Sequence, residues 1–264
     1  MAPSAVRVLA WDASAQRKAE SVSGERLAKV LAHLAADAAA RGVATSSEAA
    51  CEACVTLLGV TGAQLTLMNG TGRGESCYAT NDIGAQLENL RFTLGEGPCE
   101  DSVRSGTPVL AADLDSWDND RRWPLYVRAA VAAGARAVFV FPLRSGAIRI
   151  GALVLHRTSP GPLTQEQVFD AHVVADVVLS MLLDEMAMTH LEAEVLPLDG
   201  MPLSRAEVHQ ATGMLSVQMG VSMDEALVRL RAHAFAHDQS VVDVARDIVG
   251  RRLRLSPESR PDPR

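Results

Sequence analysis

The feature that most constrains the fold lies near the end of the chain. It is a pair made of a serine and an acidic residue three positions later, and this pair occurs three times. The three pairs are Ser204 with Glu207, Ser222 with Glu225, and Ser240 with Asp243. At this spacing the hydroxyl accepts a backbone N–H at a helix start, and the acid complements the helix dipole. Gly220 and Gly250 follow at positions typical of helix ends. Residues 204–250 are therefore predicted to form a bundle of three short helices.

The order of residues across this bundle resembles the ANTAR family of RNA-binding antiterminator domains. The resembling positions are Arg205, Val208, Ala211, Gly213, Met214, Leu215, Met219, Gly220, Ala226, Leu230, Arg231, Ala234, Asp243, Val244 and Ala245. One position departs from the family pattern, because Thr212 stands where the family usually has lysine. The loss of a cation weakens attraction to phosphate. The resemblance implies an all-α domain that binds RNA.

The resemblance further implies that structured two-loop leader RNA binds one face of the bundle, so that a terminator cannot form. The residues expected on that face are Arg205, His209, Gln210, Thr212, Gly213 and Arg231. Threonine and glutamine can bond base edges, arginine can pair with phosphate, and glycine allows close backbone approach. Without the resemblance, both arginines would be interpreted as surface partners of nearby acids, Glu207 and Asp238.

Upstream of the bundle, the apolar period changes several times between that of a helix and that of a strand. Helical spacing predicts helices at 23–41, 47–58, 85–92, 99–105 and 125–133. Strands are predicted at 63–69, 75–80, 107–112, 137–143 and 147–156, with a polar loop at 113–123. The last two strands form a hairpin near Ser145 and Gly146. Helices combined with an antiparallel sheet indicate an α+β domain.

Four short motifs in this domain resemble the signature turns and strands of GAF domains. They occupy residues 95–99 (Gly-Glu-Gly-Pro-Cys), 106–109, 141–143 and 150–153. The resemblance implies a sheet of about six antiparallel strands, with helices on one face and a ligand pocket on the other. The pocket is expected to hold an unidentified small molecule or signal and to be lined by Cys99, Trp117, Trp123, Tyr126 and Phe139. Aromatic residues at these spacings are also typical of an ordinary core.

From Thr164 the chain is predicted to form a long helix with a coiled-coil seam. The seam positions are Val168, His172, Ala175, Leu179, Leu182, Met186, Thr189 and Ala193. We expect two copies of the chain to pair along this seam as a homodimer, assisted by the helix at 23–41. The predicted organisation is a flexible tail at 1–22, the GAF domain at 23–187, a linker at 188–203, the ANTAR domain at 204–255 and a tail at 256–264.

The cysteines raise the question of thiol chemistry. Cys99 begins a predicted helix, where the dipole can lower a thiol pKa. Some GAF proteins are free methionine sulfoxide reductases, so a thiol enzyme using Cys99 and Cys77 is one alternative function. Cys51 and Cys54 share one predicted helix and are interpreted as buried residues rather than a metal or redox pair. His156 is interpreted as structural rather than as a haem ligand. We expect no catalytic residues, no metal site and no cofactor.

The net charge of −7 does not indicate a strongly basic nucleic-acid binder. A sensor whose helical module binds DNA or protein is therefore a second alternative. No apolar run reaches about 18 residues, and the first residues lack the apolar core of a signal peptide. We accordingly expect a cytoplasmic protein without a membrane partner. The combined resemblances predict a signal-responsive regulator of transcription antitermination.

Overall fold

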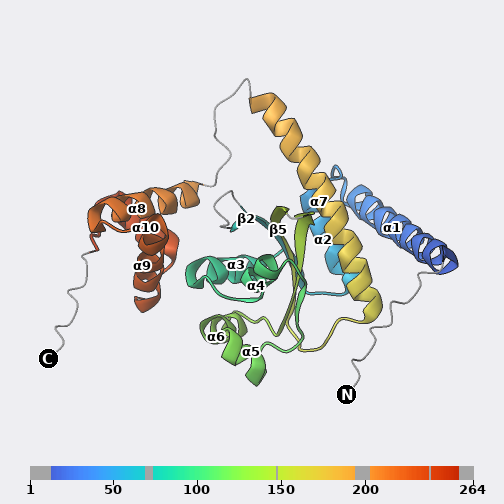
Figure 1. The fold of residues 1–264 in the computed structure, drawn as a ribbon, viewed down its shortest axis with the longest axis horizontal. Coiled ribbons are helices and arrows are strands. Elements are labelled where there is room, and N and C mark those ends of the chain that lie inside the picture. Colours follow the sequence, from blue (N-terminus) through green and yellow to red (C-terminus); the bar gives the residue numbers. More distant parts are fainter. Residues whose placement is uncertain (1–12, 69–73, 147, 194–202, 238, 256–264) are drawn as a thin grey trace, which may run out of the picture.

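The computed structural model describes residues 13–68, 74–146, 148–193, 203–237 and 239–255. Figure 1 shows two parts. The first contains a β-sheet between layers of helices and ends in the long helix α7, and the second is a cluster of three helices. The predicted fold class is confirmed: an α+β domain and a long helix precede an all-α bundle.

Within the described ranges, five antiparallel strands form one sheet in the order β2-β1-β5-β4-β3. The strands are β1 Gly62–Met68, β2 Gly74–Ala79, β3 Val109–Ala111, β4 Ala137–Ser145 and β5 Ile148–Arg157. β4 and β5 form the predicted hairpin, with Ser145 opposite Ile148 at its closed end. On the other side of β5, β1 pairs Gly62 with His156. The sheet thus has five described strands where the resemblance implied about six.

Side chains of β4 alternate between two apolar cores, one on each face of the sheet. Phe139, Phe141 and Leu143 face one helix layer, whereas Val138 and Val140 face the other. The first layer consists of α1 Ala13–Arg41, α2 Ser47–Leu58 and α7 Gln165–Ala193. The second consists of α3 Asp82–Leu94, α4 Pro98–Ser105 and α6 Pro124–Ala132, with α5 Trp117–Arg122 beside α6. Helices therefore cover both faces, rather than the one face that the resemblance implied.

Capping residues start two of the helices where the sequence predicts them. The Ser46 hydroxyl accepts a hydrogen bond from the backbone N–H of Ala49 at 3.1 Å, which starts α2 at Ser47. At α7, the Thr164 hydroxyl accepts from the backbone of Gln167 at 3.2 Å. The Gln167 side chain in turn accepts from the backbone N–H of Thr164 at 2.8 Å, which completes a capping box.

Helical structure occurs in two segments where the sequence predicts none. α1 begins at Ala13, so residues 13–22 are helical although the sequence predicts a flexible tail there. α5 lies inside the segment 113–123, which is predicted to be a polar loop. Asp118 and Asp120 occupy its first turn, where acids stabilise a helix N-terminus. Neither segment has the apolar period from which a helix can be recognised.

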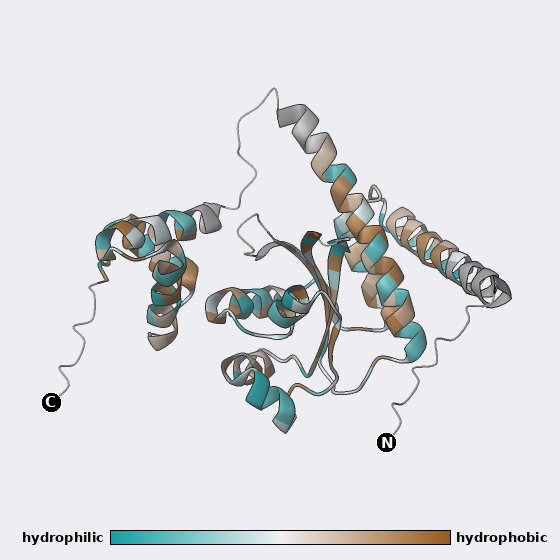
Figure 2. Cartoon of the chain, viewed as in Figure 1, coloured by the Kyte–Doolittle hydropathy of each residue, from teal (hydrophilic) through white to brown (hydrophobic). Residues whose placement is uncertain are grey.

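Helix α7 contains the predicted seam, but its own domain buries part of it. Ala175, Leu179 and Leu182 belong to the core formed with α2 and the sheet. The exposed large apolar residues of these outer helices are Phe169, Leu183 and Met186 on α7, and Leu27 and Leu31 on α1. Figure 2 shows apolar positions along both helices. A contact with a second copy would use this exposed set, and the homodimer stays a prediction.

The three-helix bundle is built from α8 Leu203–Met219, α9 Met223–Ala236 and α10 Val241–Val249. Its core is packed around Leu215, Leu230 and Ile248. Ser222 and Ser240 cap α9 and α10 as predicted, accepting backbone hydrogen bonds at 3.2 and 3.0 Å. Ser204 does not occupy the cap position of α8, because that helix already begins at Leu203.

Candidate functional site

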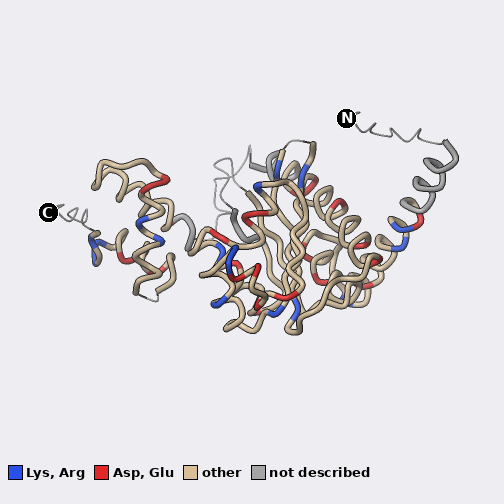
Figure 3. The backbone as a smooth tube through the Cα atoms, turned by 60° about the horizontal axis from the view of Figure 1, so that its bottom comes forward, with Lys and Arg blue, Asp and Glu red and all other residues tan. Residues whose placement is uncertain are grey.

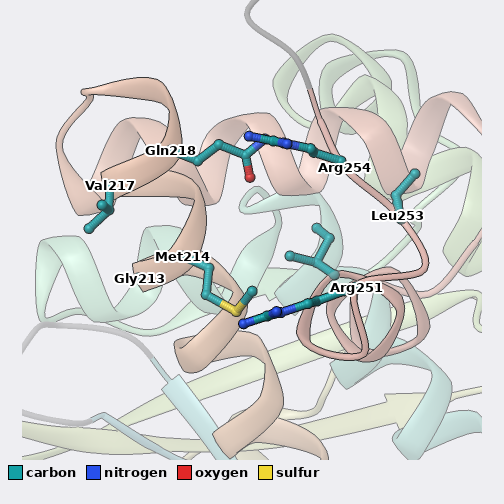
Figure 4. A pocket seen from close by; sticks show the side chains of 8 residues that line it. Gly213, Met214, Val217, Gln218, Arg251, Leu253 and Arg254 are labelled. Atoms are coloured by element: carbon teal, nitrogen blue, oxygen red, sulfur yellow. The ribbon is translucent and has the colours of Figure 1, made fainter.

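A groove of about 820 Å³ crosses the bundle between α8 and the segment that follows α10. It is lined by Gly213, Met214, Val217, Gln218, Ile248, Arg251, Leu253 and Arg254. Figure 4 shows the Arg251 side chain reaching toward Met214, and the Arg254 side chain reaching toward Gln218. Two guanidinium groups and one amide therefore border a largely apolar surface.

The segment after α10 folds back along α8 because its backbone is held at both ends. Arg251 adopts a left-handed conformation with φ of 57°, which turns the chain after the last helical residue. The backbone N–H groups of Arg252 and Leu253 then donate to the carbonyl of Asp247 at 2.7 and 3.1 Å. Farther on, the Gln218 amide donates to the carbonyl of Leu255 at 2.8 Å. These bonds place two of the arginines over α8.

The two arginines of the groove differ from others in the bundle. Acids neutralise three of those others: Arg229 pairs with Glu225 at 3.0 Å, Arg246 with Asp243 at 3.0 Å and Arg252 with Asp247 at 2.8 Å. Arg251 and Arg254 form no ion pair with another residue in the described part of the chain. Figure 3 shows basic and acidic positions interspersed along both parts of the protein. The groove is thus a local site of uncompensated positive charge on an acidic protein.

Of the residues expected on the RNA face, Gly213 lines the groove and Thr212 does not. Thr212 is fully buried, and its hydroxyl donates to the carbonyl of Val208 at 2.7 Å. This bond within the helix satisfies the hydroxyl and allows threonine to lie inside the bundle. The expectation that Thr212 contacts RNA is therefore wrong for this arrangement, because its side chain does not reach the surface.

The remaining expected residues do not share one face. Gln210 is exposed and His209 half-buried on α8, and neither lines the groove. Arg205 lies in α8, but its side chain falls outside the described residues. Arg231 lies on α9, where its guanidinium carbon is 5.7 Å from the ring centre of Phe92 in α3. Sequence reasoning missed Arg251 and Arg254 because it ended the bundle at Gly250, although the run Arg-Arg-Leu-Arg follows at once.

A buried ion pair lies between the sheet and α3 in the α+β domain. The Arg91 guanidinium donates to both oxygens of Glu88, at 2.7 and 3.0 Å, and also pairs with Glu100. The Thr66 hydroxyl of β1 donates to Glu88 at 3.0 Å. Burial alone would lower the pKa of Arg91, but the charge of Glu88 and the bonds to it raise that pKa on balance. This polar network occupies the face on which a ligand pocket was expected.

Only part of the expected pocket comes together around this network. Cys99, Trp123 and Tyr126 are buried in one apolar cluster. Trp117 is 68% exposed on α5, where it stacks with Arg121, so it lies outside that cluster. Phe139 points to the opposite face of the sheet, because side chains alternate along β4 and its neighbours Val138 and Val140 face the cluster. Three of the five residues expected in the pocket therefore lie together, and a ligand pocket beside them stays a prediction.

The thiols of Cys51, Cys54 and Cys99 are buried. Cys99 is 5% exposed, and burial raises its pKa to about 12 despite the nearby Arg91 charge. Cys51 and Cys54 lie in the core between α2 and the sheet, as the sequence interpretation has them, and all three are free thiols. The Cys77 side chain lies outside the described residues. A thiol protonated at neutral pH is a poor nucleophile, so this geometry gives no support to a thiol enzyme.

His156 is a buried histidine of β5 whose ring nitrogens have no hydrogen-bond partner among the described residues. Burial lowers its pKa to about 4, so the ring is neutral near pH 7. The described ranges contain no group of three or more His, Cys, Asp or Glu residues that could hold a metal ion. They also contain no helix long and apolar enough to span a bilayer.

Two family models match separate parts of the chain. The family model of the GAF domain matches residues 40–178, and that of the ANTAR domain matches residues 202–249. The comparison with curated proteins finds no match. Because the GAF match covers more than half of the chain, the protein belongs to the GAF domain family, and it carries an ANTAR domain at its C-terminal end. This is the domain composition of a signal-responsive antitermination regulator.

Solved structures resemble the α+β domain at low sequence identity. A domain of a two-component sensor histidine kinase protein from Sinorhizobium meliloti is 18% identical, with a TM-score of 0.45 over 55% of this chain and 94% of that chain. The GAF domain of an Acinetobacter phosphoenolpyruvate-protein phosphotransferase is 10% identical, with a TM-score of 0.45 over 64% and 98%. A type II free methionine-R-sulfoxide reductase from Thermoplasma acidophilum is 14% identical, with a TM-score of 0.37 over 52% and 89%.

Proposed function

We propose that the ANTAR domain binds structured two-loop leader RNA and thereby prevents a terminator from forming, under the control of a small molecule or signal received by the GAF domain. The observation that carries the proposal is the groove beside Gly213 in the ANTAR match, which Arg251 and Arg254 border from the segment directly after the matched residues 202–249. The protein would act in the cytoplasm.

The chemistry of the groove suits single-stranded loops. Arginine pairs with phosphate and stacks on unpaired bases, whereas the apolar side chains of Met214, Val217 and Leu253 can contact base and ribose faces. Gly213 has no heavy atom within 4 Å of an added Cβ, so the backbone of α8 is open to close approach. A helix presented to duplex DNA would instead need a row of side chains that reads base edges in the major groove.

Recognition of two loops favours two ANTAR domains held together. The exposed apolar residues of α1 and α7, Leu27, Leu31, Leu183 and Met186, are the surface through which two GAF domains would associate. Two linked binding modules gain effective concentration, which raises avidity by about 100-fold when both loops are reached. We therefore propose that the active form is a homodimer.

The test is a binding measurement with two-loop leader RNA, single-loop RNA and duplex DNA at several salt concentrations. Arg251→Ala combined with Arg254→Ala should weaken RNA binding and reduce the slope of log affinity against log salt by about 1.4, because two phosphate contacts are lost. Arg229→Ala is the matched control, since Arg229 lies in the same domain but pairs with Glu225 outside the groove.

An unchanged affinity and slope in the double variant would remove the groove from the proposal. Equal affinity for duplex DNA and two-loop RNA would favour the alternative that the helical module recognises DNA. Absence of binding to any nucleic acid would favour a protein partner.

A further inference from the structure

The ANTAR domain contacts the GAF domain through two neighbouring helices. Helix α9 lies beside α3 (Figure 1), and Phe92 of α3 packs against the core of the three-helix bundle. A second groove, of about 530 Å³, runs along this junction, with Leu90, Leu94 and Ala133 on the GAF side and Ala234 and Phe235 on the ANTAR side. The junction is therefore a packed apolar contact next to an open groove.

Arg231 is the charged residue at the centre of this contact. Its guanidinium carbon lies 5.7 Å from the ring centre of Phe92, within the range of a cation–π interaction. Its Nε atom is buried. A Cβ atom added to Gly95, the C-cap of α3, would lie 2.7 Å from its Nη1 atom. The end of α3 thus covers a cation that lies on α9, outside the groove of α8, and that is predicted from the sequence to contact RNA.

The opposite side of α3 belongs to the interior of the GAF domain. Leu87 is in the apolar core, and Glu88 and Arg91 form the buried ion pair. The carbonyl of Arg91 accepts the N–H of Gly95 at 2.9 Å, so one turn of helix joins the buried pair to the residue beside Arg231. A displacement of α3 inside the GAF domain would therefore move the surface that covers α9.

We propose that α3 and α9 form a restraining contact, in which the GAF domain covers Arg231 and lowers the affinity of the ANTAR domain for RNA until a signal displaces α3. The inference rests on the proposed function, because it assigns a consequence for RNA binding to the covered arginine. The inference adds to the proposed function a route from sensor to output. The GAF domain acts on the ANTAR domain through the end of α3, in addition to any change in the association of two copies.

Two substitutions weaken the contact by different means. Phe92→Ala removes the ring under Arg231, and a cation–π contact of this kind changes an equilibrium constant by about two- to fivefold. Gly95→Asn places a side chain where the guanidinium now lies, and asparagine tolerates the left-handed conformation at φ of 67°. Either variant leaves Arg231 in place, so its own contribution to RNA binding is preserved.

The chain offers a matched control for each substitution. Trp117→Ala removes an exposed ring that also lies near an arginine, with the guanidinium carbon of Arg121 4.5 Å from the ring centre, but on α5 and outside the contact between α3 and α9. Gly42→Asn introduces asparagine at an equivalent φ of 68°, where no heavy atom lies within 4 Å of an added Cβ. Thermal melting of all four variants identifies any effect that comes from loss of folding.

The experiment has one readout that does not depend on RNA. The full chain is treated with phenylglyoxal, which modifies accessible arginines, and modification of Arg231 is compared by mass spectrometry with that of exposed Arg251. In the wild type we expect Arg231 to react several-fold more slowly than Arg251. In Phe92→Ala and Gly95→Asn its reaction should become about two- to fivefold faster, with no change in the controls. Affinity for two-loop RNA should rise in the same two variants.

The possible failures are distinguishable. If Arg231 reacts as fast as Arg251 in the wild type, or stays slow in both contact variants, the contact does not cover it and the inference is wrong. If labelling increases but RNA affinity does not, the contact exists without restraining RNA binding, which also overturns the inference. If labelling behaves as expected but no chain binds RNA, the cover on Arg231 stands and the proposed function is what fails.

Discussion

Replacing Arg91 with methionine tests how far the buried ion pair of α3 stabilises the GAF domain. The side chains of Arg91 and Glu88 are 3% and 2% exposed, and two hydrogen bonds join them. Methionine occupies similar space but donates no hydrogen bond, so Glu88 loses both bonds to the guanidinium. Removing one partner of a buried pair typically costs about 3–5 kcal/mol, because the remaining charge is left in a poorly solvated place. We expect a loss of this size in the free energy of unfolding.

Two further variants test whether the loss of stability comes from an unpaired buried charge or from changed packing. Glu88→Gln combined with Arg91→Met removes both charges and should lose only about 1–2 kcal/mol, since neutral replacement of a buried pair is often tolerated. Arg104→Met breaks a pair with Asp101 in which the arginine side chain is 73% exposed, and it should cost less than about 1 kcal/mol.

Urea unfolding followed by tryptophan fluorescence measures these differences, because Trp123 is buried in the cluster next to the pair. The reasoning is refuted if Arg91→Met lies within about 1 kcal/mol of the wild type. It is also refuted if the double variant is as unstable as the single one, because the loss would then come from packing rather than from an isolated charge.

The remaining predictions concern a thiol, a histidine and the dimer. Cys99 should resist a thiol reagent at pH 8 in the folded chain, because its pKa is near 12, and should react after unfolding in urea; rapid labelling of the folded chain, detected on the peptide containing Cys99, would revive the enzyme alternative. Stability should fall as pH drops from about 6.5 toward about 4, since the folded chain keeps His156 neutral while the unfolded chain binds the proton. The loss should reach at most about 3 kcal/mol and should vanish in His156→Gln, as measured by unfolding across this pH range. Leu183→Glu with Met186→Glu should convert a dimer to a monomer in sedimentation velocity at unchanged domain stability, whereas a wild type that sediments as a monomer would contradict the proposed dimer.

Local signals account for what the sequence predicts well. The start of α2 follows from Ser46, and the capping box at Thr164 marks the start of α7 before any packing is known. The β4–β5 hairpin follows from two strand-forming runs joined by a short turn that includes Gly146. In each case the information lies within a few residues of the feature. The same holds for Ser222 and Ser240 in the bundle.

What the sequence does not predict depends on contacts between distant segments. Alternation along β4 shows that Phe139 and Val140 face opposite sides, but only the packed helices show that Phe139 faces α7. The α8 pattern does not say that the Thr212 hydroxyl is satisfied within the helix and buried. The groove arises where the chain folds back after α10, so the role of Arg254 could not be inferred from periodicity.

The left-handed conformation of Arg251 has a consequence for how the groove could change. A residue other than glycine in this region is strained by roughly 1–2 kcal/mol, whereas the preceding Gly250 has an ordinary φ of −72°. Arg251→Gly would relieve this strain and remove the guanidinium from the groove. The most stable form of this turn and the most strongly cationic form of the groove are therefore different sequences. A search for thermostable variants would tend to select against the charge on which the proposed RNA contact depends.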